Sequence, residues 1–172
     1  MEPFDFVVIF FAKYAVFIIV AFAVGYWLTL PKKQKIQMLV FGVFVATIAF
    51  LLTRIGGALY YDSRPFVSMG VDPIIPHADN NGFPSDHTAL AFTAAATMFY
   101  MNKKLGILTL VVAILVGASR VLGYIHSPID ILGSIMFVAI AYAAAYRMTQ
   151  PVMRKIYKND NSVAQYQHPD KM

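Results

Sequence analysis

The sequence predicts an all-α fold, a polytopic helical bundle with about five transmembrane helices, and two observations support this prediction. First, 59% of the 172 residues are hydrophobic and only 13% are charged, whereas soluble domains carry about 25% charged residues. Second, long uncharged runs divide the chain, and each approaches the roughly 20 residues that a helix needs to cross a hydrocarbon core. A soluble bundle is disfavoured because none of these runs has a polar face.

The predicted helices follow the uncharged runs in order. They cover residues 4–30, 36–60, 85–102, 105–125 and 128–148. The connections between the first two helices and between the third and fourth are very short, so neighbouring helices should run antiparallel. We therefore expect one membrane-embedded domain over residues 1–148, followed by a polar cytoplasmic tail over 149–172.

Lysine and arginine placement predicts the orientation of the bundle. Basic residues follow the first, third and fifth predicted helices, which places them all on one side. They are Lys32, Lys33, Lys35, Lys103, Lys104, Arg147, Arg154, Lys155, Lys158 and Lys171. The positive-inside rule makes this side cytoplasmic, so the N-terminus is expected outside and the C-terminus inside. Glu2 and Asp5 stand where a signal peptide would be basic, so the first helix should be retained.

The net charge of +5 comes mostly from this flank, and it favours anionic lipid headgroups. The chain shows no basic groove with interleaved aromatic residues, so nucleic acid is not an expected partner.

Three loop aspartates match no metal-binding loop and are interpreted as solvated: Asp62, Asp72 and Asp79. Three aromatic residues at the same end are interpreted as a membrane-interface belt: Tyr60, Tyr61 and Phe66. We therefore expect neither a metal nor a cofactor.

Three polar segments stand at the predicted outer ends of the helices, and the topology brings them to one face. They cover residues 60–66, 83–88 and 119–130. Ser85 and Ser127 are predicted N-caps, and the free N–H groups at a helix N-terminus favour an anion. Arg64 and Arg120 add guanidinium groups that suit phosphate oxygens. Charged groups at membrane depth are costly, so this combination indicates a functional site.

Two histidines in these segments bring reactive side chains. His126 and Asp130 are four residues apart, so the carboxylate can hold one ring nitrogen and leave the other as a nucleophile. His87, in the first turn of its helix, can protonate a leaving oxygen. His77, in a polar loop, and His168, in the tail, are interpreted as structural or solvated.

These residues resemble the sequence pattern of the type 2 phosphatidic acid phosphatase superfamily. The pattern reads Lys, six residues, Arg-Pro; then Pro-Ser-Gly-His; then Ser-Arg, five residues, His, three residues, Asp. Its third part is present in full as Ser119, Arg120, His126 and Asp130. The second part is present as Pro84, Ser85 and His87, with Asp86 in place of Gly. The first part is present only as Arg64-Pro65, with Gly57 in place of Lys.

The resemblance implies a metal-independent phosphatase that works through a phosphohistidine intermediate. His126 would be the nucleophile, Asp130 its orienting partner and His87 the general acid. The phosphate-binding residues would be Arg64, Arg120, Ser85, Ser119 and Asp86. The Pro-Ser-Asp-His variant is similar to the bacitracin-resistance type of undecaprenyl-diphosphatases, which implies a polyprenyl diphosphate as substrate and an active site on the extracytoplasmic side of the cell membrane.

Other activities remain open at this stage. A phosphatase for phosphatidic acid or phosphatidylglycerol phosphate, or a phosphotransferase, would need the same residues. A non-catalytic lipid-binding or transport protein would bind phosphate without turnover, and the haloperoxidase relatives of the family are large soluble proteins. The lipid tail and the oligomeric state are not determined by these residues.

Two cations could replace the absent Lys of the first motif. Arg54 lies one turn before Gly57, but helical side chains lean toward the N-terminus of their helix, which here is away from the outer face. Lys13 belongs to a helix that runs inward, so its side chain should lean toward the site. The sequence therefore favours Lys13, although a lysine near a helix end can also extend to the interface.

Overall fold

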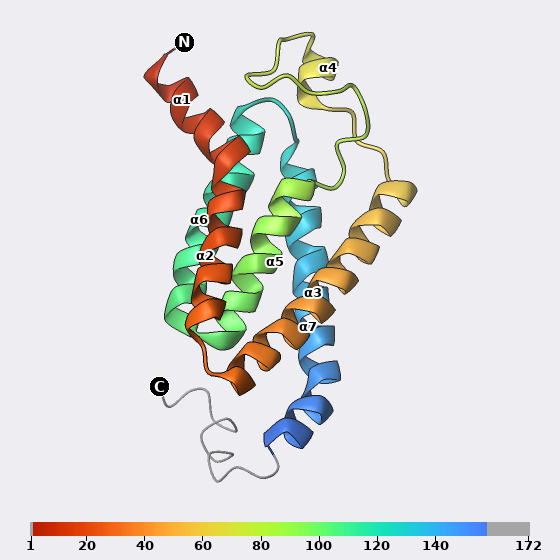
Figure 1. Cartoon of the computed structure of the whole chain (residues 1–172). Helices are drawn as coiled ribbons and strands as arrows, with labels where there is room; N and C mark the ends of the chain where they lie inside the picture. The colour runs from red at the N-terminus through yellow and green to blue at the C-terminus, as the bar shows by residue number, and fades with distance from the viewer. Residues whose placement is uncertain (1, 158–172) are drawn as a thin grey trace.

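The computed structural model describes residues 2–157, and these residues form helices and loops without a β-strand. The first helical rod consists of α1 (Pro3–Ile9), a π-helical turn η1 (Phe10–Tyr14) and α2 (Ala15–Thr29). The rest of the bundle consists of α3 (Lys32–Leu59), α5 (Asp86–Met101), α6 (Lys103–Leu122) and α7 (Pro128–Tyr157). A short helix, α4 (Pro65–Met69), lies in the long connection between α3 and α5 (Figure 1). The predicted all-α bundle is confirmed.

Within the described residues, four helical segments are long and apolar enough to cross a membrane: Pro3–Thr29, α3, α6 and α7. The remaining helix of the bundle, α5, has 16 residues and is therefore about 24 Å long, shorter than a hydrocarbon core of about 30 Å. The chain is a multi-pass membrane protein. A complete fifth crossing by α5 and the orientation of the termini stay predictions.

Helix α7 is longer than the sequence suggested. It continues past residue 148 to Tyr157, with Pro151 inside the helix. The extension is held by packing, because Met153 and Tyr157 are buried and the Tyr157 hydroxyl donates to Oε1 of Gln37 over 2.8 Å. Residues 158–172 of the predicted tail, including His168, lie outside the described residues.

Small residues and aromatic rings form the centre of the bundle. Phe41 of α3 is fully buried and stacks on Tyr100 of α5 with the ring centroids 3.8 Å apart. Alanines on α5, α6 and α7 allow close approach of the helix backbones. At the α5–α6 turn, a Cβ on Gly106 would lie 2.2 Å from Cα of Phe99, so this contact requires glycine. Large apolar side chains cover the outside of the bundle, as expected of a surface that faces lipid.

One end of the bundle is covered by the connection from α3 to α5. This segment contains α4 and passes over the start of α5 and the turn from α6 to α7 (Figure 1). Asn81 fixes its path: Nδ2 donates to the carbonyl oxygens of Gly57 and Tyr60, each over 2.9 Å, and Oδ1 accepts from the backbone N–H groups of Asp62 and Phe83. The three polar segments, the first of which is part of this cover, therefore meet at one end of the bundle.

Candidate functional site

A cavity of about 340 Å³ lies beneath this cover, where α3 ends, α5 begins and α6 turns into α7. Six of the site residues predicted from the sequence line it: Arg54, Arg64, Asp86, His87, Arg120 and His126. The other lining residues are Thr53, Gly57, His77, Asn80, Asn81, Phe83 and Pro84. Four segments far apart in the sequence thus contribute to one polar chamber.

His126 is held by Asp130 on one side of its ring. Its Nδ1 lies 3.1 Å from Oδ2 of Asp130, and the same oxygen accepts the backbone N–H of Ser127 over 2.9 Å. Asp130 is fully buried behind the cavity and is not part of its lining. Because Asp130 occupies the third position of α7, its carboxylate also closes the N-terminus of that helix. The local spacing of four residues is sufficient to produce this pair.

Arg120 faces the other nitrogen of the same ring. Its Nη2 lies 3.5 Å from Nε2 of His126, and Nη1 donates to the carbonyl oxygen of Ala12 in the π-helical turn over 3.1 Å. A guanidinium has only donors, so Nε2 must present its lone pair to Arg120, and the ring proton then lies on Nδ1, toward Asp130. This tautomer leaves Nε2 unprotonated beside a buried cation, the form that a histidine needs to act as a nucleophile.

Arg64 is buried and fastens the cover to the catalytic turn. Its Nη1 donates to the Ile125 carbonyl oxygen over 2.8 Å, Nε to Oδ1 of Asn80 over 2.9 Å, and Nη2 to the Asn81 carbonyl oxygen over 3.2 Å. The guanidinium is therefore immobilised next to His126 before any ligand arrives. Fixed charge of this kind can stabilise a transferring phosphoryl group without reorganisation.

Ser85 and Ser119, both predicted to bind phosphate, are buried outside the cavity lining. The Ser85 hydroxyl accepts from the hydroxyl of Thr88 over 3.0 Å and caps α5, as the sequence predicted. Ser134 joins this start to α7, since its hydroxyl donates to the carbonyl oxygens of Ser85 and Asp130. Ser119 donates to the Val116 carbonyl oxygen over 2.7 Å. In this structure Ser85 caps the helix that carries His87, and Ser119 bonds within its own helix, α6.

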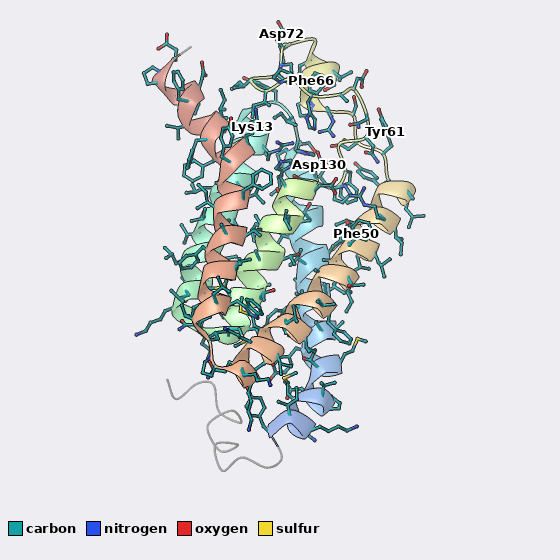
Figure 2. All side chains as sticks on the ribbon, viewed as in Figure 1. Lys13, Phe50, Tyr61, Phe66, Asp72 and Asp130 are labelled. Atoms are coloured by element: carbon teal, nitrogen blue, oxygen red, sulfur yellow. The ribbon has the colours of Figure 1, made fainter. Side chains whose placement is uncertain are left out.

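The two candidates for the missing cation are placed differently. Arg54 lines the cavity and forms an ion pair with Asp86. Lys13 does not line it; its ammonium lies over the Tyr14 ring, 5.4 Å from the centroid, on the first helical rod (Figure 2). The expected lean of Arg54 away from this end does not hold, because Asp86 at the start of α5 attracts the guanidinium.

His77 and Asp62 correct two interpretations made from the sequence. His77 is half-buried and lines the cavity, with its ring centroid 6.3 Å from that of His126. The carboxylate of Asp62 accepts a hydrogen bond from the Ser127 hydroxyl, so it is a structural contact and not only a solvated loop group. No sequence signal marked His77, because its position depends on the path of the whole 70–82 segment.

Burial controls the protonation of the two histidines that lie in loops. Desolvation lowers the pKa of His126, and the hydrogen bond to Asp130 opposes this shift only in part. Desolvation, with the charges of Arg64 and Arg120, lowers the pKa of His77 to about 4. Both rings are therefore neutral near pH 7, and a neutral ring is the form in which His126 can act as a nucleophile. Within residues 2–157, no three metal-ligating His, Asp or Glu side chains converge.

The fold and the site define a membrane protein of the PAP2 superfamily, and the chain belongs to this family: the PAP2 family model matches residues 39–154. The chain is similar to the bacitracin transport permease protein BcrC of Bacillus licheniformis, with 37% identity over 126 residues, or 73% of the chain and 62% of that protein. It is also similar to the undecaprenyl-diphosphatase BcrC of Bacillus subtilis (strain 168), with 32% identity over 79% of the chain and 70% of the relative.

A third relative is the putative undecaprenyl-diphosphatase YbjG of Escherichia coli (strain K12), with 30% identity over 87% of the chain and 76% of the relative. The chain thus spans less than two thirds of the Bacillus licheniformis protein and somewhat more of the other two. The matched region includes every residue of the cavity lining.

Proposed function

We propose that the protein is an integral membrane phosphatase that hydrolyses a polyprenyl diphosphate, such as undecaprenyl diphosphate, to the monophosphate through a phosphohistidine on His126. The observation that carries this proposal is the state of the His126 ring: Nδ1 is held by Asp130 while Nε2 faces Arg120 at the cavity. The family membership and the names of two relatives support the same substrate class.

The reaction has two steps. In the first, Nε2 of His126 attacks the terminal phosphorus, the bond from phosphorus to the bridging oxygen breaks, and His87 donates a proton to that oxygen. The lipid monophosphate leaves. In the second, His87 accepts a proton from a water molecule that attacks phosphorus, and the bond between phosphorus and Nε2 breaks, which releases inorganic phosphate. Acid–base assistance of this kind typically contributes about 10²–10⁴-fold.

Charge stabilisation in this proposal comes from the protein's own cations. Arg64 and Arg120 lie next to His126 and suit the oxygens of the transferring group. We therefore propose that turnover requires no metal ion. By the positive-inside rule, we also propose that the cavity opens on the extracytoplasmic side of the cell membrane.

The test is phosphate release by the purified protein in detergent, with undecaprenyl diphosphate, phosphatidic acid and phosphatidylglycerol phosphate supplied side by side in excess chelator. Fastest turnover of the diphosphate is expected. Preference for either phosphoglycerolipid would replace the proposed substrate with a lipid monophosphate. Binding of all three lipids without phosphate release would favour a non-catalytic lipid-binding or transport role.

A further inference from the structure

One departure from the family motifs forms an ion pair beside the other. Gly57 stands where the first motif has Lys, and Asp86 stands where the second has Gly; Arg54, one turn before Gly57, pairs with Asp86 at the cavity. We infer that Arg54, positioned by Asp86, binds the phosphate group that remains on the lipid, and that it makes the site prefer a diphosphate to a monophosphate. This inference rests on the proposed function and assigns a specificity residue within it.

The backbone around Gly57 packs closely against the start of α5. A Cβ on Gly57 would lie 3.0 Å from the carbonyl oxygen of Phe83, a contact that requires a shift of a few tenths of an ångström, and 3.5 Å from Cδ of Pro84, which is ordinary packing. The amide of Asn81 also donates to the Gly57 carbonyl oxygen, which holds the cover against this turn of α3. A cation one turn earlier on α3 reaches the cavity without any such shift.

The cations of the cavity lie at two depths. Arg64 and Arg120 are 6% and 3% exposed, and His126 between them is 3% exposed. The side chains of Arg54 and Asp86 are 51% and 66% exposed, so their pair lies at the rim. A terminal phosphate at His126 would be surrounded by the two inner arginines. The second phosphate, which carries the lipid, must lie farther out, toward Arg54.

Hydrogen bonds to the protein hold the inner arginines in place, whereas the rim pair can exchange its partner. Arg64 makes three hydrogen bonds that fix the cover and the turn before α7. Arg120 donates to Ala12 and faces His126. An exposed ion pair such as that of Arg54 and Asp86 contributes little to stability, so a phosphate oxygen can take the place of Asp86.

The charges of Arg54 and Asp86 allow the site to distinguish a diphosphate from a monophosphate. Without substrate, Asp86 compensates the charge of Arg54, so the rim adds little attraction for a ligand whose only phosphate lies at His126. A diphosphate brings a second anionic group within reach of Arg54 and gains a charge-assisted bond that a monophosphate lacks. In this arrangement Asp86 is a positioning residue, and Arg54 is the group that contacts the substrate.

The test compares Arg54→Gln and Arg54→Lys with the matched control Arg147→Gln, an exposed arginine on α7 outside the cavity lining. For Arg54→Gln we expect kcat/KM on undecaprenyl diphosphate to fall about 10–100-fold, and turnover of phosphatidic acid to change about threefold or less. Arg54→Lys should recover part of the loss, because lysine keeps the positive charge but lacks the planar guanidinium that can bind two phosphate oxygens. Arg147→Gln should match the wild type on both lipids.

A binding measurement keeps this inference separate from the proposed function. Methylenediphosphonate and inorganic phosphate are titrated into each purified variant by calorimetry. Weaker diphosphonate binding in Arg54→Gln, with phosphate binding unchanged, supports the inference even if the wild type hydrolyses no lipid, a result that would reject the proposed function alone. The inference would be overturned if Arg54→Gln weakened binding of both ligands equally or of neither. A selective loss of diphosphonate binding in Lys13→Gln instead of Arg54→Gln would also overturn it.

Discussion

Gly82 lies so close to Asp130 that a Cβ on the glycine would stand 2.9 Å from Oδ2 of the carboxylate. This oxygen is the one that faces Nδ1 of His126 and accepts the N–H of Ser127. The backbone of Gly82 cannot easily retreat, because its N–H donates to the Asp62 carbonyl oxygen over 2.8 Å. The cover of the cavity therefore contacts the carboxylate that orients His126, the proposed nucleophile.

Gly82→Ala should reduce activity without changing any reactive group. The added methyl must displace the Asp130 carboxylate or the cover, and the His126 ring then loses its fixed orientation. Because catalysis is sensitive to small displacements, we expect kcat to fall by about 10–100-fold. Gly25→Ala is the matched control, since a Cβ at Gly25 meets nothing within 4 Å. Equal kcat values for the two variants would contradict the proposed coupling between cover and site.

His126 and His87 should differ in their dependence on the leaving group. His126→Ala removes the nucleophile and should be inactive on every substrate. His87→Ala removes only the proposed proton donor, so it should be slowed by about 10²–10⁴-fold on a lipid monophosphate and less on an aryl phosphate with an acidic phenol. Steady-state rates on both substrates provide the measurement. Activity retained by His126→Ala, together with its complete loss in His87→Ala, would exchange the two roles.

The pH dependence of kcat/KM should report the neutral form of His126. Activity requires the unprotonated ring, so it should rise with pH through the pKa of His126 and then level off. Because burial lowers this pKa from its usual value of 6.5, the midpoint of the acidic limb should lie below pH 6.5. The hydrogen bond to Asp130 raises the pKa, so Asp130→Asn should move the midpoint to still lower pH while reducing kcat. A midpoint above pH 6.5 in the wild type would argue against this assignment.

Asn81 should contribute to stability more than its position in a loop suggests. Asn81→Ala removes the side chain that joins Gly57 and Tyr60 to the N–H groups of Asp62 and Phe83. Leaving such groups without partners costs about 1–3 kcal/mol, so the thermal unfolding temperature in detergent should fall. Asp72→Ala, at an exposed position of the same segment, serves as the control. Identical unfolding temperatures would show that water replaces these bonds at no cost.

A single cysteine can establish which side of the membrane the cavity faces. The chain has no native cysteine, and Asp72 is exposed on the cover (Figure 2). Asp72→Cys should react with an impermeant maleimide added to intact cells, and a cysteine at Lys104, beyond the far end of α5, should react only after lysis. The opposite labelling pattern would place the site in the cytoplasm.

The sequence was sufficient to predict the features that depend on the spacing of residues close together in the chain. Uncharged runs predicted the bundle, and the spacing of four positions from His126 to Asp130 predicted a pair that the structure brings to 3.1 Å. Features that depend on distant segments were missed. His77 and Asn81 reach the cavity because the cover folds back over α5, and the position of Arg54 is decided by Asp86 on another helix. The rule that helical side chains lean toward the N-terminus of their helix takes no account of this attraction between Arg54 and Asp86.

The short length of α5 has a consequence for the water and lipid around the site. Lys103 and Lys104 begin α6 just after the end of α5, and we expect them at the polar boundary of the bilayer. Because α5 is short, we expect its opposite end, with Ser85 and His87, to stop below the other boundary. There the cover of residues 60–84 replaces lipid headgroups and supplies hydrogen bonds that hydrocarbon would lack. On the proposed function, a lipid phosphate then need not leave its leaflet to react, whereas the released inorganic phosphate must pass the cover to reach water.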